Sequence, residues 1–153
     1  MDAIDRRILT VLQADASLAV AEIATRVGLS ATPCWRRIQN LEKAGVIRGR
    51  VALLHGPSIN LGVTVFVGLK TGRHGQDWLE EFATRIAAID EVVEFYRMAG
   101  DVDYLLKVVA PDIAGYDAVY KRLISAIEFS DVSSSFAMEE IKYTTALPLK
   151  YAR

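Results

Sequence analysis

The chain has 153 residues, of which 52% are hydrophobic and 24% charged, so its composition is that of an ordinary globular protein. No apolar run is long enough to span a bilayer, and no basic-then-apolar leader follows Met1. We therefore expect a protein of the cytoplasm that does not engage a membrane. A single cysteine excludes an internal disulfide, and together with only His55 and His74 it predicts no metal cluster.

Charge is distributed unevenly along the chain. Residues 1–50 carry eight Lys/Arg and five Asp/Glu, a net charge of +3, whereas residues 51–153 carry ten and fourteen, a net charge of −4. This asymmetry predicts two units with different partners. Positive charge in the first unit suits contact with phosphates, although a surplus of +3 is too small to indicate nucleic acid by itself.

The first 50 residues carry the pattern of three amphipathic helices. Asp2 and Asp5 resemble a capping box before apolar residues at helical spacing, so a first helix is expected over residues 2–14. The stretch 21–47 then predicts a short helix, a tight turn and a second helix. Gly28 marks the turn, because glycine adopts a positive φ without a Cβ clash.

The second helix of that stretch begins at Ser30, whose hydroxyl is expected to cap it, and Pro33 fits its first turn. Its apolar stripe faces a core, while the opposite, basic face begins at its N-terminal end, as a recognition helix requires. We predict a DNA-binding helix-turn-helix that places this helix in the major groove. The candidate DNA contacts are Ser30, Thr32, Pro33, Trp35, Arg36, Arg37, Gln39, Asn40 and Lys43.

Several of these residues have alternative interpretations. Arg36 and Arg37 could form a solvated helix face, and Arg37 could pair with a carboxylate such as Glu42. Trp35 fits stacking within the head as well as contact with the DNA backbone. Cys34 lies on the apolar stripe, which favours a small buried hydrophobe over a redox sensor.

Turn-forming residues separate the two predicted domains. Gly45 ends the recognition helix, and the basic segment Arg48–Arg50 precedes an extended run, a pattern that predicts a winged helix-turn-helix with at most a small wing. Residues that interrupt helices and strands cluster at His55–Ser58, which marks the candidate domain boundary. We assign residues 1–50 to the DNA-binding domain, 51–60 to a linker and 61–153 to a second domain.

The second domain has the element order β-α-β-β-α-β, which predicts an α+β, ferredoxin-like fold with four antiparallel strands and both helices on one face. Asp112 is expected to cap the second helix, whose apolar face comprises Ile113, Tyr116, Val119, Tyr120, Leu123, Ile124 and Ile127. The expected elements are strand 62–71, helix 75–89, strand 92–99, strand 103–110, the helix after Asp112, strand 132–143 and a tail over 144–153.

This arrangement leaves one face of the predicted sheet without a cover. The strand 104–110 is nearly all apolar, and Phe66 and Phe95 fall on faces that would otherwise be exposed to water. A strand that is apolar on both sides is buried on both sides. The simplest cover is the same sheet of a second copy, which predicts a two-fold homodimer.

The whole chain resembles the Lrp/AsnC family of transcription regulators, named for its leucine-responsive and asparagine-responsive members. The resemblance rests on motifs in the expected order along the chain: Ile4–Leu9, Gly28–Ser30, Thr32–Pro33 with Arg37, Leu41–Glu42, Gly45–Ile47, Gly62, Glu91–Val92, Gly100–Tyr104 and Leu147–Leu149. The amino-acid sequences of three segments resemble a subgroup with cysteine-responsive and branched-chain-responsive members: Thr32–Arg37, Ser135–Met138 and Lys142–Thr145.

The resemblance implies a DNA-binding head, a hinge strand and a RAM or ACT-like sensor domain that forms dimers, which assemble into tetramers or octamers. It also implies that an amino acid, sulfur-containing or branched, binds between dimers near a Gly-Asp-x-Asp-Tyr turn. Turn amides can hold its carboxylate and an Asp side chain its ammonium group. The candidate effector residues are Gly100, Asp101, Val102, Asp103 and Tyr104, with Met98, Ser133, Ser134 and Ser135 as walls.

The predicted function is a sequence-specific transcription regulator of amino-acid metabolism, whose partners are double-stranded DNA, a small amino acid and further copies of itself. No cofactor besides the amino acid is expected. Asp101 and Asp103 could be simple turn residues. An enzyme is not expected, since no nucleophile–base pair or phosphate loop accompanies these carboxylates. The alternatives are a ligand-binding regulatory subunit of an enzyme and an architectural DNA-binding protein without an effector.

Overall fold

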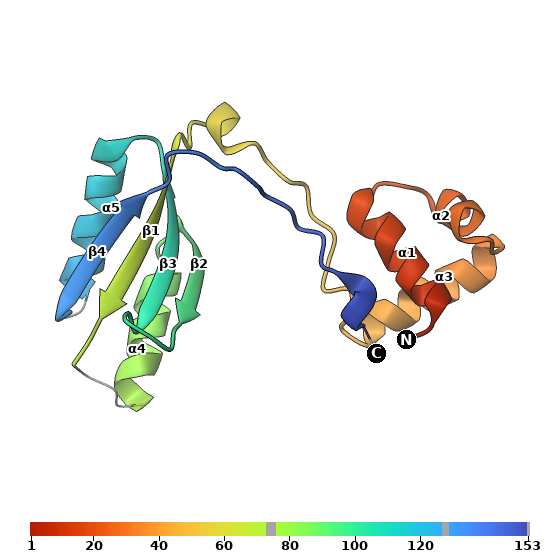
Figure 1. Ribbon diagram of the computed structural model, residues 1–153, viewed down its shortest axis with the longest axis horizontal. Helices are drawn as coiled ribbons and strands as arrows, with labels where there is room; N and C mark the ends of the chain where they lie inside the picture. Colours follow the sequence, from red (N-terminus) through yellow and green to blue (C-terminus); the bar gives the residue numbers. More distant parts are fainter. Residues whose placement is uncertain (73–75, 127–128, 153) are drawn as a thin grey trace. The chain divides into compact units, whose positions relative to one another are not determined.

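The computed structural model describes residues 1–72, 76–126 and 129–152. The chain divides into two compact units, each with its own core (Figure 1). Unit 1, the head, comprises Met1–Leu53 and Lys142–Arg153, and unit 2, the sensor domain, comprises Leu54–Ile141. None of the helices in the described ranges is long and apolar enough to cross a membrane.

The head contains three helices, α1 (Ala3–Ala14), α2 (Val20–Val27) and α3 (Ala31–Lys43), as the sequence pattern predicted. Their apolar faces meet in one core. The buried members of that core are Ile8, Leu9, Leu12, Ile23, Ala24, Val27, Cys34, Ile38 and Leu41. This packing leaves the opposite face of α3 to solvent.

Local signals fix the ends of these helices. Asp2 accepts from the backbone N–H groups of Ile4 and Asp5 while the Asp5 side chain accepts from the Asp2 N–H, which confirms the capping box. Gly28 ends α2 in the left-handed region at φ 73°. Ser30 is the N-cap of α3, but in the described chain its hydroxyl makes no cap hydrogen bond, so that part of the prediction is wrong.

The wing is only a loop in this structure. No strand lies between α3 and the sensor domain in the described residues 44–62, which contain the short 3₁₀ helix η1 (Gly56–Ile59). This outcome is consistent with the prediction of at most a small wing.

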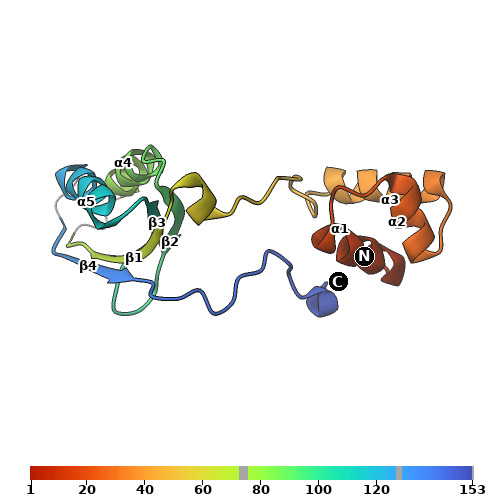
Figure 2. The same cartoon turned by 90° about the horizontal axis from the view of Figure 1, so that it is seen from above.

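The sensor domain has the predicted ferredoxin-like order. Its strands are β1 (Val63–Lys70), β2 (Val92–Arg97), β3 (Tyr104–Ala110) and β4 (Asp131–Phe136). They form one antiparallel sheet in the order β2-β3-β1-β4. Helices α4 (Gln76–Ala87) and α5 (Ile113–Ala126) cover one face of this sheet, as Figure 2 shows.

The core between helices and sheet is aromatic at its centre. Phe82 of α4 is fully buried and contacts the rings of Trp78, Phe95, Tyr104 and Phe129. Strand β3 alternates between fully buried residues, which face the helices, and half-buried residues, which face the other side. The helix-covered face is therefore a complete core, and the other face is not.

Phe95 and the last strand differ from the prediction. Phe95 packs on the helix-covered face, because a register shift between Val92 and Glu94 reverses the alternation of β2. The strand expected over residues 132–143 ends at Phe136, and beyond it Met138 and Ile141 are 95% and 90% exposed.

The face predicted for α5 is also partly wrong. Asp112 caps the helix by accepting from the Gly115 N–H, as expected. Ile113 and Ile124 are exposed, however, whereas Tyr116, Val119 and Leu123 are buried. Ile127 lies outside the described residues.

The C-terminal residues belong to the head. Lys142–Arg153 group with the three helices, and the short 3₁₀ helix η2 (Leu149–Tyr151) places Leu149 against their core. The predicted second domain, 61–153, is therefore too long at its C-terminal end. Residues 144–153 were expected only as a tail, and in the structure Leu147 and Ala152 form hydrogen bonds with helix α1.

Candidate DNA interface and effector site

The solvent face of α3 carries most of the predicted DNA contacts. Ser30, Thr32, Pro33, Trp35, Arg36, Asn40 and Lys43 are exposed, and Gln39 is half-buried. Thr32, Arg36 and Asn40 line an open groove of about 650 Å³ that also borders Met1 and Asp5. Trp35 is 52% exposed, so it is available to a partner and is not stacked inside the head. Hydrogen-bonding and positively charged groups thus gather on one accessible helix face.

Arg37 differs from its neighbour Arg36. Its guanidinium lies 2.6 Å from the Asp2 carboxylate and 2.8 Å from the Asp5 carboxylate, so it joins α3 to the start of α1. The suggested partner Glu42 instead accepts from Gln39 and Arg50. In the described chain, Arg36 makes no ion pair. Arg36 therefore keeps its charge available for DNA, whereas the charge of Arg37 is already balanced within the head.

This arrangement predicts a pKa change in the variant Arg37→Gln. The Asp5 backbone N–H and then the Arg37 guanidinium lower the pKa of Asp2 from 3.8 to about 2. Without the guanidinium we expect that pKa to rise while staying below 3.8, since the Asp5 N–H remains. Because the folded-state pKa is depressed, ionised Asp2 favours the folded head above its unfolded pKa. This contribution disappears as the pH falls toward the folded-state pKa.

Carboxyl carbon shifts followed by NMR between pH 1.5 and 6 measure the pKa of Asp2 in both proteins. Asp15 serves as the internal control, since the Ser17 hydroxyl and N–H are the main causes that lower its pKa. An unchanged pKa at Asp2 would contradict the ion pair.

Cys34 lies on the buried side of α3 and is fully inaccessible. Burial raises the pKa of its thiol, which favours the protonated and unreactive form. The interpretation of Cys34 as a small core hydrophobe therefore fits the structure. Within the described residues no group of three or more His, Cys, Asp or Glu side chains is placed to hold a metal ion, and His74 lies outside those residues.

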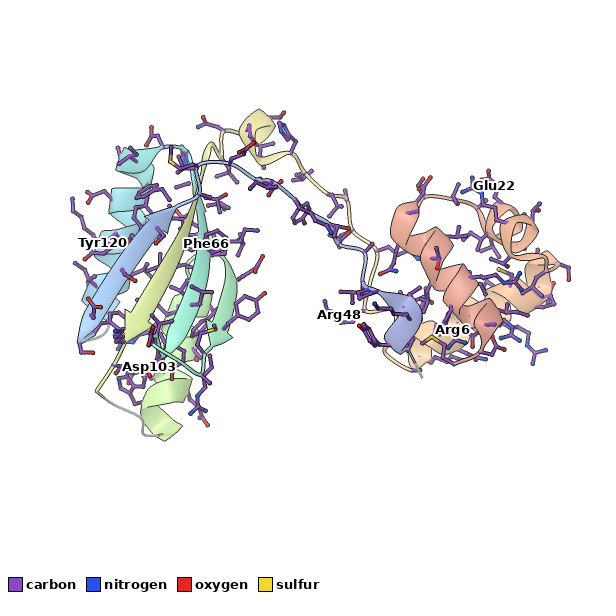
Figure 3. All side chains as sticks on the ribbon, in the orientation of Figure 1. Arg6, Glu22, Arg48, Phe66, Asp103 and Tyr120 are labelled. Carbon is purple, nitrogen blue, oxygen red and sulfur yellow. The ribbon has the colours of Figure 1, made fainter. Side chains whose placement is uncertain are left out.

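The predicted effector turn joins β2 to β3 and is tied to the end of β1. The Met98 N–H donates to the Asp103 carbonyl, and the Asp103 N–H donates to the Leu69 carbonyl. The carboxylate of Asp103, which is labelled in Figure 3, accepts a hydrogen bond from the Thr71 N–H at 2.8 Å. Asp103 therefore holds the turn in place, whereas Asp101 is exposed and makes no side-chain hydrogen bond within the described chain.

Two of the predicted effector residues meet over Gly68 of β1. A Cβ at Gly68 would lie 2.8 Å from the Ser133 hydroxyl and 3.0 Å from a Val102 methyl. Glycine is therefore required here for close approach. Ser133 and Ser135 lie opposite Gly68 and Phe66, on the face without helices. The turn and strand β4 thus come together on the uncovered side of the sheet.

The remaining predicted effector residues lie in three different environments. Tyr104 is 3% exposed and lies among the aromatic rings of the core, so its ring is not accessible to a ligand at the turn. Ser134 faces α5, where its hydroxyl shares a short hydrogen bond with the Tyr116 hydroxyl. Gly100, with φ 145°, shapes the turn, and Met98 beside it is partly exposed.

Comparison with known proteins settles the family. Residues 64–147 match the model of the Lrp/AsnC ligand binding domain, and residues 1–48 match a winged helix-turn-helix DNA-binding model. The chain belongs to the Lrp/AsnC family. The turn and the three serines of β4 fall inside the ligand-binding match, and α1 to α3 fall inside the DNA-binding match. The chain is therefore a DNA-binding transcription regulator and not an enzyme.

Three relatives show how far the likeness of this Lrp/AsnC regulator extends. It is 50% identical to the glutamate uptake regulatory protein of Zymomonas mobilis, over 97% of this chain and 91% of that protein. The crystal structure of an AsnC family regulator from Agrobacterium tumefaciens is 61% identical over the full length of both chains, with a TM-score of 0.97. The regulator NMB0573 of Neisseria meningitidis, solved in complex with L-Met, is 38% identical over 98% and 97% of the two chains, with a TM-score of 0.92.

Sequence reasoning missed several residues of this Lrp/AsnC regulator. Asp2 and Asp5 were interpreted only as caps, although two carboxylates at the start of a helix could also hold Arg37. Gly68 carried a usable signal, since an isolated glycine inside a strand marks a close approach. Gln13 and Arg6, which bind the C-terminal tail, carried no signal in the periodicity.

Proposed function

We propose that this Lrp/AsnC regulator acts in the cytoplasm as a homodimer or an assembly of dimers, and that a small amino acid bound at the β2–β3 turn controls it. Two recognition helices of a dimer then read half-sites about one helical turn apart. A bound amino acid changes DNA affinity through a coupling free energy of about 1–3 kcal/mol.

The uncovered face of the sheet is the observation that carries the self-association. Phe66 is 39% exposed at its centre (Figure 3), and Leu105 and Val109 of β3 are half-buried on the same side. Tyr96, also on this face, donates to Glu94, which accepts from Lys107 as well. A self-complementary partner would cover the apolar residues, and the ion pair supplies polar contacts beside them.

The effector proposal rests on the turn. Asp103 ties the turn to the end of β1, and we infer that the turn's backbone amides and the exposed Asp101 carboxylate meet an amino acid's charged groups. Val102 adds an apolar contact next to Ser133. The complex of the Neisseria relative with L-Met supports an apolar amino acid as the ligand.

Thermal denaturation with each of the twenty amino acids tests the effector. A ligand at one hundred times its Kd adds about 2.7 kcal/mol to the free energy of unfolding, which raises the Tm. We expect methionine or another apolar amino acid to raise it. A Tm that none of the twenty changes would contradict effector binding and favour an architectural DNA-binding role.

The variant Gly68→Ala should weaken effector binding with little effect on folding. The added Cβ lies too close to Val102 and Ser133, so the turn must move, while the helix-covered core is untouched. We expect an affinity loss of about tenfold, which is about 1.4 kcal/mol, by isothermal titration with the amino acid found above. Gly72→Ala is the control, because a Cβ there meets nothing within 4 Å. Equal affinities in the two variants would exclude the turn as the site.

A further inference from the structure

The C-terminal tail binds α1 of the head through specific contacts. The Gln13 side chain accepts from the Leu147 N–H at 2.6 Å and donates to the Leu147 carbonyl at 3.2 Å. Arg6, labelled in Figure 3, donates to the Ala152 carbonyl at 3.0 Å. Leu149 packs against the core of the head. Residues 147–152 are therefore attached to the head by two polar contacts with α1 and one apolar contact with its core.

This attachment gives the chain two connections between its units. The first leaves α3 and passes from the head to the sensor domain at residues 53 and 54. The second leaves β4, returns at residues 141 and 142 and ends on α1. Residues 137–148 contain no helix or strand, so this second connection is a simple chain fixed at both ends.

We propose that the docked tail is a second tether, which limits rotation of the head so that the two heads of a dimer engage two half-sites together. This inference rests on the proposed homodimer. A body held by one flexible link can rotate about that link, whereas a body held at α1 and α3 separately loses that freedom. Restricting the heads raises the effective concentration of the second head at its half-site.

Two full-length variants release the tether in different ways. In Gln13→Ala/Leu149→Ala, the tail loses its paired hydrogen bonds and its apolar anchor. In the other variant, a six-residue Gly/Ser insertion after Glu139 lengthens the connection and leaves both ends unchanged. Ile141→Ala, in the same connection and at a 90% exposed side chain, is the matched control.

DNA affinity is measured on two duplexes that carry a half-site sequence obtained by in vitro selection with this protein. One duplex holds a single half-site, and the other holds two half-sites one helical turn apart. Trypsin cleavage after Lys150 reports whether the tail is docked. Sedimentation velocity of the same samples reports the oligomeric state.

We expect both variants to lose at least about tenfold in affinity for the two-site duplex and to keep their affinity for the single site. Cleavage after Lys150 should accelerate only in the double substitution. Equal losses on both duplexes would overturn the proposal, since the tail would then only support folding of the head. Unchanged two-site affinity in either variant would also overturn it.

The unmodified chain supplies a further check. If the unmodified chain binds the two-site duplex no more tightly than the single-site duplex, the tether does not help two heads to bind together. Sedimentation then separates the two causes, because a monomer means that the proposed assembly has failed, whereas a dimer means that only the tether has failed.

Discussion

Arg36→Ala should lower the affinity for DNA by about 10- to 100-fold, which corresponds to roughly 1–3 kcal/mol for the loss of one specific contact. Arg36 is exposed on α3, borders the groove shared with Thr32 and Asn40, and makes no ion pair in the described chain. Its charge is therefore free to meet DNA. Fluorescence anisotropy with an operator duplex at several salt concentrations measures both the affinity and its salt dependence.

The salt dependence identifies the kind of contact. The affinity for DNA falls as salt rises, and loss of a phosphate contact makes the slope of log affinity against log salt less steep by about 0.9. Loss of a base contact instead relaxes sequence preference and leaves this slope nearly unchanged. Arg37→Gln is the adjacent control and should leave the slope unchanged, since Asp2 and Asp5 balance this charge. Lys121→Ala, on α5 of the sensor domain, controls for net charge. An Arg36→Ala variant that binds like the unmodified chain would remove α3 from the interface.

The features that sequence predicted well depend on neighbouring residues. The capping pair Asp2 and Asp5, the turn at Gly28 and the alternation in β1 are each decided within a few positions. For this reason the helix-turn-helix and the order of the sensor domain follow from spacing alone. The candidate DNA contacts could be predicted because they form the polar side of a helix whose other side is apolar.

The features that sequence missed depend on distant residues or on one irregular position. A single register shift in β2 moved Phe95 to the other face, because side chains alternate with a period of two. The tail contains alternating apolar residues, but nothing in that pattern identifies Gln13, 134 positions away, as its partner. Tyr104 belongs to the turn motif in sequence, yet it also begins β3, and its direction on that strand places its ring in the core.

Phe66→Glu should convert the assembly to monomers. Phe66 lies at the centre of the uncovered sheet face, opposite Lys107 on one side and Ser135 on the other. In a single chain the new carboxylate stays hydrated and next to Lys107, so the fold should persist. In a dimer the partner sheet would enclose it, and because Lys107 is already paired with Glu94, the added charge would be buried without a compensating charge, at a cost of about 3–5 kcal/mol. The monomer–dimer Kd should therefore rise by at least about a hundredfold.

Sedimentation velocity across a concentration series measures this change, and far-UV circular dichroism checks the fold of the variant. Ile113→Glu is the matched control, since it adds the same charge at an exposed apolar residue at the start of α5, away from the uncovered face. Monomers of Phe66→Glu should keep the single-site DNA affinity, because α3 is unchanged, and should lose the gain from a second half-site. If Phe66→Glu and Ile113→Glu sediment alike as dimers, the copies associate through another surface. The half-buried residues of β3 are then not covered by a second copy of the sheet.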